Sequence, residues 1–304
     1  MNPAPPRPFA SIVVSNWEGE QVLARCLSSL QLSAARCQRD IELLVVDDAS
    51  TDGSAALVRE RFPRARLLVN ERNIGFGPST MRGIRAARGR VVILCNNDLA
   101  ASEDFVPRLL SWFQAKEAVL PSGERIPHER LFAVGARTMR WWDGEPQHVR
   151  MVAAWSGGRL NAEAEDAAGP CRCDFVQAGA AAYNRAHLLR LGGLRPLFEP
   201  GYWEDYDLSY RAVRSGLACL YDPGALALHH GGGSMARRFG EEGVHRLRAR
   251  NHLLFEWSNL RPREWPAYAA RLPFNVAREW AAGRTPRLTR ALWEATLRLA
   301  DASR

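Results

Sequence analysis

Apolar runs and amphipathic segments alternate along residues 9–98. Short apolar runs with many β-branched residues occupy 9–14, 41–46, 66–69 and 90–95. Between the first two runs, apolar residues recur at helical spacing: Val22, Leu23, Cys26, Leu27 and Leu30. Near-continuous apolar strands separated by helices are typical of a parallel sheet that is covered on both faces. The pattern therefore predicts an α/β fold.

Polar side chains follow these strands where each of them ends. Ser15 follows the first strand, Asp48 the second, and Asn97 and Asp98 the fourth. Open α/β sheets bind ligands beyond the carboxyl ends of their strands, so we expect a site at this edge. Neither GxGxxG nor GxxxxGK[ST] is present, which indicates that a diphosphate would be held through a divalent cation, Mg²⁺ or Mn²⁺.

The middle of the chain has a less regular pattern. Residues 116–170 are rich in Gly, Ala and Arg, and we expect an insertion, either a substrate loop or a surface excursion with a small core of its own. Helical patterns are expected again at 185–191 and at 205–215, where Gly216 ends the second one. A short strand is expected at 218–221.

Three carboxylates, Glu204, Asp205 and Asp207, lie within four residues at the start of the helix predicted at 205–215. Aromatic residues flank them, and apolar surroundings raise the pKa of a carboxyl group, which suits a general base. Acidic residues at a helix N-terminus also complement the helix dipole, and Asp207 can pair with Arg211. From these residues alone, both interpretations stay open.

The positive charge of the chain is concentrated at its C-terminal end. The net charge is +8, and residues 235–304 hold 14 Arg against 7 Asp and Glu. A local basic region favours a local anionic partner over a nucleic acid lying across the whole protein. The tail from about residue 240 is helical in pattern, with Trp interleaved with Arg, which predicts peripheral binding to an anionic membrane surface. The alternative is packing against the rest of the chain or against a second subunit, as a homodimer.

Several absences bear on localisation. No apolar run approaches the ~18 residues of a membrane-spanning helix. Residues 1–8 are Pro-rich and lack the apolar core of a signal peptide, so we expect a flexible leader. The six scattered cysteines fit reduced thiols in the cytosol. We therefore expect a cytoplasmic protein, peripheral to the inner face of the cell membrane.

The order of short motifs along the chain resembles a known family. The motifs are SIVVSNW at 11–17, VVDDASTDGS at 45–54, NIGFG at 73–77, NND at 96–98, GG at 192–193, WEDYDL at 203–208 with Arg211, and HHGGGS at 229–234. In this order they resemble family 2 inverting glycosyltransferases of the GT-A fold, in particular the bacterial rhamnosyltransferase-like branch. The resemblance runs from about residue 9 to 260, and it implies a Rossmann-like, mostly parallel sheet flanked by helices, with a C-terminal helical extension.

The resemblance also implies roles on the donor side. Asp48 matches the acid that contacts the base of the nucleotide, and Ser15 lies near the nucleoside. Further donor-binding positions are Asn73, Gly75 and Asn97. Asp98 matches the last carboxylate of a DxD-type metal-binding element, and His229 the histidine that completes the metal site in part of the family. Asn96 stands at the first DxD position, so a single carboxylate of this element remains.

On the acceptor side, the resemblance implies that Asp205 is the general base that deprotonates the acceptor hydroxyl. Trp203 and Glu204 are then acceptor-side neighbours, and adjacent positions lead us to expect that the side chains of Glu204 and Asp205 point apart. An inverting transfer needs one base, because a metal-bound diphosphate is already a good leaving group.

The expected organisation is a GT-A catalytic domain at 9–239, with a nucleotide-binding half at 9–98 and an acceptor half at 99–239, followed by a basic, Trp-rich helical tail at 240–304. The expected function is transfer of a sugar from a nucleotide-diphosphate donor to a glycan or lipid-linked glycan, in cell-surface polysaccharide biosynthesis. One alternative, a nucleotidyltransferase, would carry a Gly- and Arg/Lys-rich loop after the first strand. The other, a non-catalytic sugar- or nucleotide-binding scaffold, would be expected to lack Asp98 or Asp205.

Overall fold

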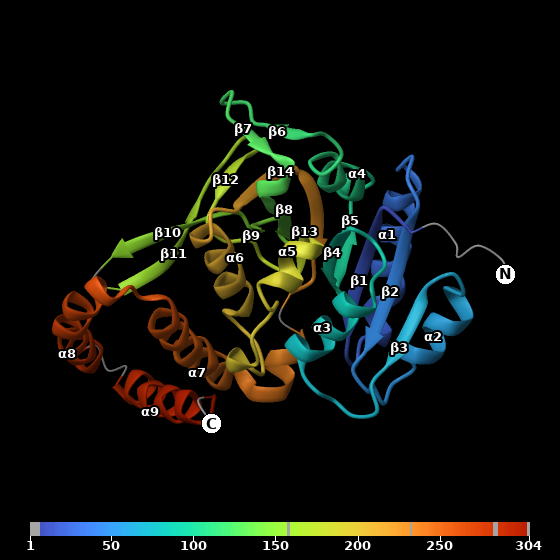
Figure 1. Cartoon of the computed structure of the whole chain (residues 1–304). Coiled ribbons are helices and arrows are strands. Elements are labelled where there is room, and N and C mark those ends of the chain that lie inside the picture. The colour runs from blue at the N-terminus through green and yellow to red at the C-terminus, as the bar shows by residue number, and fades with distance from the viewer. Residues whose placement is uncertain (1–6, 157–158, 232, 282–284, 303–304) are drawn as a thin grey trace.

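A computed structural model describes residues 7–156, 159–231, 233–281 and 285–302. The first six residues of the leader predicted at 1–8 lie outside these ranges. The described chain is built around one ten-stranded sheet with helices on both faces, and a group of C-terminal helices lies at one end (Figure 1).

Four parallel strands form the N-terminal half of the sheet, in the order β3-β2-β1-β4. They are β1 (Ala10–Asn16), β2 (Ile41–Asp47), β3 (Arg66–Val69) and β4 (Val91–Asn96). In register, Ile12 of β1 lies beside Leu43 of β2 and Ile93 of β4. The four strands predicted in this part of the chain are confirmed, and their carboxyl ends lie at the same edge.

The sheet continues beyond β4 with strands from the second half of the chain, in the order β13-β8-β14-β12. Their bounds are β13 (Ala180–Asn184), β8 (Leu131–Arg140), β14 (Ala218–His229) and β12 (Cys171–Cys173). β13 is antiparallel to its neighbours β4 and β8, β8 and β14 are parallel, and β12 is antiparallel to β14. Two short strands extend this half: β5 (Leu99–Ala101) pairs with β14, and β9 (Pro146–His148) with β8.

The expectation that residues 116–170 are an insertion is wrong for β8, which lies inside the main sheet. Its first six residues are buried, but only Leu131–Val134 form an apolar run, and Arg137 and Arg140 interrupt the pattern further on. Arg137 is accommodated because its guanidinium donates to the hydroxyl of Tyr221 (3.0 Å). The rest of the segment forms two hairpins, β6 (Glu117–Val119) with β7 (Arg125–Pro127), and β10 (Arg150–Ser156) with β11 (Arg159–Glu165).

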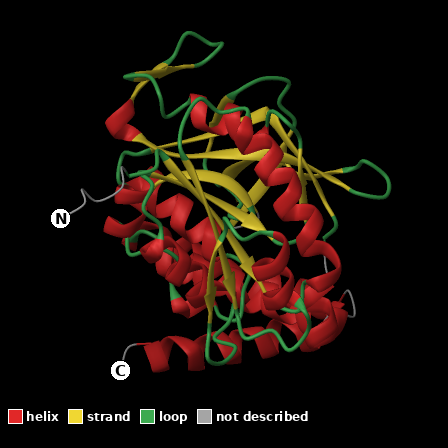
Figure 2. Cartoon of the chain, turned by 90° about the vertical axis from the view of Figure 1, so that its right-hand side faces the viewer, coloured by secondary structure: helices red, strands yellow, loops and turns green. Residues whose placement is uncertain are grey.

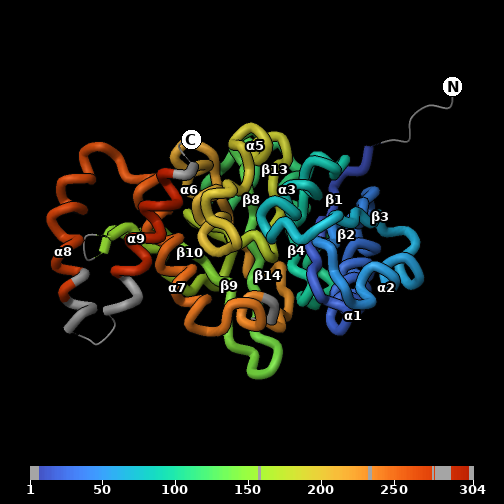
Figure 3. The backbone as a smooth tube through the Cα atoms, turned by 90° about the horizontal axis from the view of Figure 1, so that it is seen from below, coloured from blue at the N-terminus to red at the C-terminus, as the bar shows by residue number. Residues whose placement is uncertain are grey.

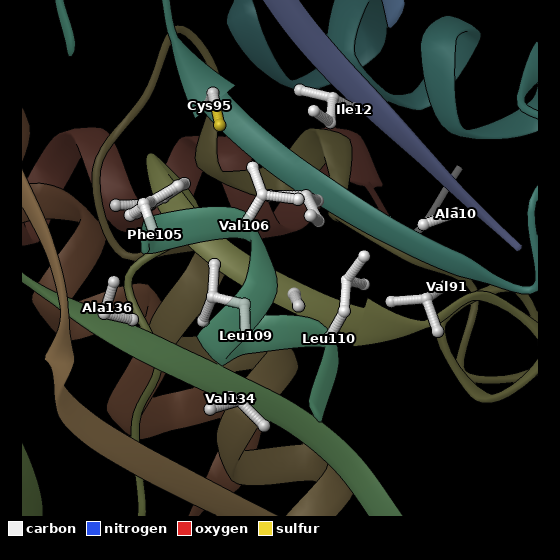
Figure 4. Packing of buried hydrophobic residues seen from close by; sticks show 14 of the residues in the cluster. Ala10, Ile12, Val91, Cys95, Phe105, Val106, Leu109, Leu110, Val134 and Ala136 are labelled. Carbon is white, nitrogen blue, oxygen red and sulfur yellow. The ribbon is translucent and has the colours of Figure 1, made fainter. Parts of the chain in front are cut away.

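Helices cover the two faces of the sheet, as predicted (Figure 2). On one face lie α1 (Glu20–Ala35), α2 (Ser54–Arg61) and α4 (Phe105–Ser111); on the other lie α3 (Phe76–Ala86), α5 (Arg185–Arg190) and α6 (Glu204–Arg214). Alternate residues of β1 serve the two cores: Ile12 and Val14 pack with α1 and α4, and Val13 packs with α3. Figure 4 shows Phe105, Leu109 and their neighbours packed against the strands.

The C-terminal helices α7 (Gly233–Asn259), α8 (Trp265–Ala281) and α9 (Thr285–Ala302) lie at the end of the molecule opposite α2 and β3 (Figure 3). Leu253, Leu254 and Phe255 of α7 are fully buried in a third core with residues of α9, the β10–β11 hairpin and the short helix η2 (Pro196–Phe198). Part of the basic tail thus packs against the rest of the chain. None of the helices in the described ranges is long and apolar enough to cross a bilayer.

Candidate active site

A cleft of about 570 Å³ opens where the strands of the parallel half end. This volume lies within the range of about 300–1,000 Å³ that is typical of ligand pockets. The ten residues predicted to form the site all line it: Ser15, Asp48, Asn73, Gly75, Asn97, Asp98, Trp203, Glu204, Asp205 and His229. Residues that are far apart in the sequence are therefore neighbours here.

Asp48 organises one wall of the cleft. Its carboxylate accepts hydrogen bonds from the N–H groups of Ile74 (3.0 Å) and Gly75 (2.8 Å) and from the amide of Asn70 (2.6 Å). Gly75 has a φ of 90°, a conformation that favours glycine. The carboxylate therefore holds the 73–75 turn against the end of β2.

Two neighbouring acids, Asp47 and Asp52, have local structural partners. Asp47 is 1% exposed and accepts from the amide of Asn16 (2.7 Å) and from the hydroxyl of Ser50 (2.7 Å). Asp52 precedes Gly53, the N-cap of α2, and accepts from the N–H of Ser54 (3.0 Å) and from that of Glu20 (2.9 Å). Of Asp47 and Asp48, only Asp48 lines the cleft.

The ends of β1 and β4 are joined by a pair of asparagines. The Nδ2 of Asn97 donates to the Oδ1 of Asn16 (2.7 Å), and a Cβ at Gly19 would lie within 2.1 Å of that oxygen. Glycine is therefore required at the start of α1 for this close approach. Ser15 bonds through its hydroxyl to that of Thr80 on α3 (2.7 Å).

Asp98 and His229 meet at the centre of the cleft, although they are far apart in the sequence. Oδ1 of Asp98 lies 3.1 Å from Nε2 of His229, and Oδ2 accepts from the N–H of Gly231 (3.1 Å). Burial raises the pKa of Asp98, but the hydrogen bonds from His229 and from the N–H of Gly231 outweigh it, so the pKa lies below its usual value.

The donor set of this pair fits a divalent cation. Oε1 of Gln147 accepts from Nδ1 of His229 (2.6 Å), so Nε2 is the ring atom that faces Asp98, at 3.1 Å. A protonated ring donates from Nε2 to Asp98, and a neutral ring offers the same atom as a metal ligand. One carboxylate and one imidazole suit Mn²⁺ or Mg²⁺ when substrate phosphates supply further oxygens. The described residues offer no cluster of three or more His, Cys, Asp or Glu side chains able to hold a metal by themselves.

The opposite wall of the cleft is an acidic turn that leads into α6. Tyr202 and Trp203 have φ angles of 75° and 74°, and strain of this kind costs roughly 1–3 kcal/mol per residue. Asp205 accepts from the N–H of Ala178 (3.0 Å) through Oδ2, which ties the first turn of α6 to the segment before β13. The turn is therefore held in a conformation that its sequence does not favour.

Glu204 and Asp205 both line the cleft, and burial raises the pKa of both. Burial, followed by the charges of Asp205 and Asp207, raises the pKa of Glu204 to about 8. Burial also raises the pKa of Asp205, against the hydrogen bonds from the Ala178 and Tyr206 N–H groups. Oε2 of Glu204 is buried and has no hydrogen-bond partner among the described residues. Burial therefore favours the protonated form of Glu204, and its Oε2 is a buried polar atom that no described residue satisfies.

Asp207 and Trp203 have structural partners. Asp207 is fully buried and accepts from Arg195 (2.8 Å), Arg211 (2.8 Å) and Asn259 (3.0 Å), so it stabilises α6. The ring of Trp203 stacks on His252, with centroids 4.2 Å apart and planes 2° from parallel. One face of the indole is thus occupied by packing.

Some residues that line the cleft lie outside the sequence motifs, among them Arg238, Arg248 and His148. Arg238 and Arg248 project from α7: Arg238 donates to Asn73 (3.2 Å), and the guanidinium of Arg248 lies 4.7 Å from the ring centroid of Tyr202. Burial lowers the pKa of His148 to about 3, so its imidazole is neutral. The two arginines lie in α7, and the sequence does not predict that this helix packs beside the cleft. Only their position shortly after the HHGGGS motif could have indicated that they line the site.

Solved structures of similar fold are glycosyltransferases. A mannosyltransferase of Pyrobaculum calidifontis, in complex with GDP-Man and Mn²⁺, superposes with a TM-score of 0.56 at 17% sequence identity, over 96% of this chain and 76% of that one. This likeness shows the fold. The architecture, with a cleft at the strand ends, is that of a GT-A glycosyltransferase.

The family follows from sequence comparison. The model of the family described as "Glycosyl transferase family 2" matches residues 11–190, and the chain belongs to this family. An N-acetylglucosaminyl-diphospho-decaprenol L-rhamnosyltransferase of Mycobacterium tuberculosis is 25% identical over 241 residues, which cover 71% of this chain and 74% of that protein. An undecaprenyl-phosphate 4-deoxy-4-formamido-L-arabinose transferase of Pseudomonas fluorescens is 33% identical over 111 residues, which cover 35% of this chain and only 32% of that relative.

Proposed function

We propose that this chain transfers a sugar, with inversion, from a nucleoside-diphosphate donor to a glycan or lipid-linked glycan acceptor, in cell-surface polysaccharide biosynthesis. The observation that carries the proposal is the cleft itself, in which Asp48, the Asp98–His229 pair and Asp205 lie together. They supply a nucleoside wall, a cation site and a base. Family membership and the lipid-linked substrates in the names of two relatives support it.

The donor is assigned to the wall formed by the strand ends. Asp48 and the turn that it holds at Asn73 and Gly75 face the nucleoside, with Ser15 and Asn97 beside it. Arg238, which contacts Asn73, lies where an anionic donor enters. Since the sequence contains neither GxGxxG nor GxxxxGK[ST], we assign the placement of the diphosphate to the cation site at Asp98 and His229.

Asp98 and His229 are the residues that would hold the divalent cation. When bound, Mn²⁺ or Mg²⁺ neutralises the charge that develops on the leaving nucleoside diphosphate. Asp98 keeps its negative charge over the neutral pH range because its pKa is lowered, and Gln147 fixes the orientation of the His229 ring. The cation in the mannosyltransferase structure supports this assignment.

Asp205 is assigned as the general base. It lines the same cleft as the Asp98–His229 pair, and the N–H of Ala178 orients its carboxylate. Its raised pKa brings it closer to the operating pH, which favours proton transfer. Glu204 is assigned to the acceptor, because its neutral carboxyl group and unbonded Oε2 can hydrogen-bond to a sugar hydroxyl. Trp203, which lines the same cleft, is assigned to the acceptor side as well.

The tail is assigned to the inner face of the cell membrane, with the chain peripheral to it in the cytoplasm. Phe274, Trp293 and Leu297 of α8 and α9 are 60%, 66% and 47% exposed, and the tail is rich in Arg. Exposed aromatic and aliphatic side chains beside basic ones suit an anionic bilayer surface. The alternative is that the same residues lie in the interface of a homodimer.

The test is a screen of UDP-, GDP- and dTDP-sugars with the full chain, in the presence of Mn²⁺, of Mg²⁺ or of a chelator. We expect one nucleotide class to bind and to be hydrolysed slowly, and the chelator to abolish hydrolysis. NMR of the released or transferred sugar should show inversion at the anomeric carbon. Failure of every nucleotide sugar to bind would contradict the proposal.

A further inference from the structure

The strained turn that carries Glu204 and Asp205 is held by one side chain of the C-terminal tail. Asn251 of α7 is fully buried, and its Nδ2 lies 2.6, 2.8 and 2.9 Å from the carbonyl oxygens of Phe198, Gly201 and Tyr202. An amide nitrogen has two hydrogens to share among these three acceptors. One side chain therefore bonds to three of the backbone carbonyls of the turn.

Neighbouring residues of α7 fix Asn251 itself. Arg250 donates to the Oδ1 of Asn251 (2.8 Å) and also to the carbonyl of Glu199, so the amide can turn only its donor side to the turn. The next residue, His252, stacks on Trp203. Three consecutive residues of α7 thus contact the segment that ends where α6 begins.

The conformation of this turn decides where Asp205 lies. Tyr202 and Trp203 are both in the left-handed region, and Glu204 starts the helix directly after them. Without donors on its carbonyls, the turn loses what offsets this backbone strain. The N–H of Ala178 holds the carboxylate of Asp205, but it does not hold the backbone that carries it.

We propose that Asn251 is a positioning residue for sugar transfer, which acts by holding the 198–203 turn so that Asp205 and Glu204 face the acceptor. This rests on the proposed function, in which Asp205 is the base. It also gives the tail a part in the chemistry, besides any role at a membrane.

Asn259 supplies a matched control on the same helix. It is 4% exposed, and its amide donates to Asp207 (3.0 Å) and to the carbonyl of Phe255 (2.9 Å), away from the turn. Asn251→Leu and Asn259→Leu each keep the branched shape of the side chain, add a similar volume, and remove one buried amide. Both variants should lose stability, because each leaves buried acceptors without donors.

The experiment measures three quantities for each variant, at a temperature where circular dichroism shows it folded. They are the affinity for the nucleotide sugar that the wild type binds, the kcat for its hydrolysis or transfer, and hydrogen exchange at the amides of Gly201 and Asp207. These amides bond to the carbonyls of Phe198 (3.0 Å) and Trp203 (2.9 Å), and so report on the turn.

We expect Asn251→Leu to keep donor affinity, to speed exchange at Gly201 and Asp207, and to lower kcat by about 100-fold, the scale of a reacting group misplaced by about 1 Å. Asn259→Leu should keep a kcat close to that of the wild type. Asn251→Ser, which retains one short donor, should recover part of the lost rate. Equal kcat in the Asn251 and Asn259 variants, or unchanged exchange in Asn251→Leu, would overturn the inference.

The two proposals fail in different ways. If the wild type binds no nucleotide sugar, the proposed function fails, and the exchange measurement alone decides whether Asn251 holds the turn. If the wild type is active and Asn251→Leu retains its kcat, only the inference fails.

Discussion

The two walls of the cleft are built in different ways. On the donor wall, Ser15, Asp48 and Asp98 follow directly from the ends of parallel strands, and the sheet fixes their positions. On the acceptor wall, Asp205 lies on a strained turn that depends on Ala178 and on Asn251, which are distant in the sequence. From this difference we expect that donor binding and sugar transfer can be disturbed separately in this protein.

The largest expected effect is that of Asp205→Asn. Transfer should fall by about two orders of magnitude or more, the usual scale for the loss of a general base, while donor binding stays nearly intact. The matched change Asp207→Asn weakens the ion pairs with Arg195 and Arg211 and should mainly lower the melting temperature. Steady-state kinetics and calorimetry of both variants check this. Wild-type turnover in Asp205→Asn would show that another group is the base.

Asp98→Asn on the donor wall should, in contrast to Asp205→Asn, weaken the binding of the donor. The affinity for the nucleotide sugar in Mn²⁺ should fall at least ~10-fold, because loss of support around a metal typically costs about 10–100-fold. His229→Gln should act in the same direction, and titration calorimetry with and without Mn²⁺ measures both. If the dependence on Mn²⁺ were the same in wild type and in Asp98→Asn, the metal assignment would be wrong.

The raised pKa of Glu204 makes the free energy of unfolding of the chain depend on pH. Its pKa of about 8 in the folded chain is above the ordinary value of 4.5, so the folded chain keeps a proton that the unfolded chain loses. This contribution to stability is fully present below about pH 4.5 and is lost as the pH rises through about 8. Urea unfolding across this range should therefore show a falling free energy of unfolding, with a smaller slope in Glu204→Gln. Equal slopes would assign the effect to other groups.

The smallest effect is expected at the tail surface, away from both walls. Replacing Trp293 and Leu297 of α9 by Ser should weaken binding to anionic vesicles and leave kcat in solution unchanged. Each buried aliphatic or aromatic side chain contributes about 1.5–3 kcal/mol to such binding at most. Leu32→Ser on α1, where Leu32 is 67% exposed, is the control. Unchanged vesicle sedimentation together with a monomer–dimer shift in gel filtration would favour the dimer.

The sequence predicts the donor wall well because that wall is local. The strands at 41–46 and 90–95 and the polar residues after them can be seen in a short window, and parallel pairing brings them to one edge. The strand β8 escapes prediction because Arg137 and Arg140 interrupt its apolar run, and its burial depends on pairing with β13 and β14. A pattern of single residues cannot show that Tyr221 will accept from Arg137.

The acceptor wall is predicted as a set of acids but not as a structure. The motif around Asp205 indicates a base, yet nothing nearby indicates the left-handed backbone of Tyr202 and Trp203 or the amide of Asn251 that bonds to it. Charge and Trp content in the tail favoured a membrane surface, and the same composition also contains the packing face at Leu253–Phe255. Long-range contacts of this kind become visible only when α7 is docked.

The length of α7 has a consequence for how such proteins can be recombined. The helix contacts the donor wall through Arg238, bends at Gly240, where φ is 67°, and beyond this bend contacts α9, Tyr202 and the turn. If the tail after residue 240 were exchanged for that of a relative, Arg248 and Asn251, which line or support the cleft, would therefore be replaced together with the exposed surface of the tail. The C-terminal helices and the candidate site are thus physically coupled, so we expect a tail exchange to change the cleft as well as the exposed surface of the tail.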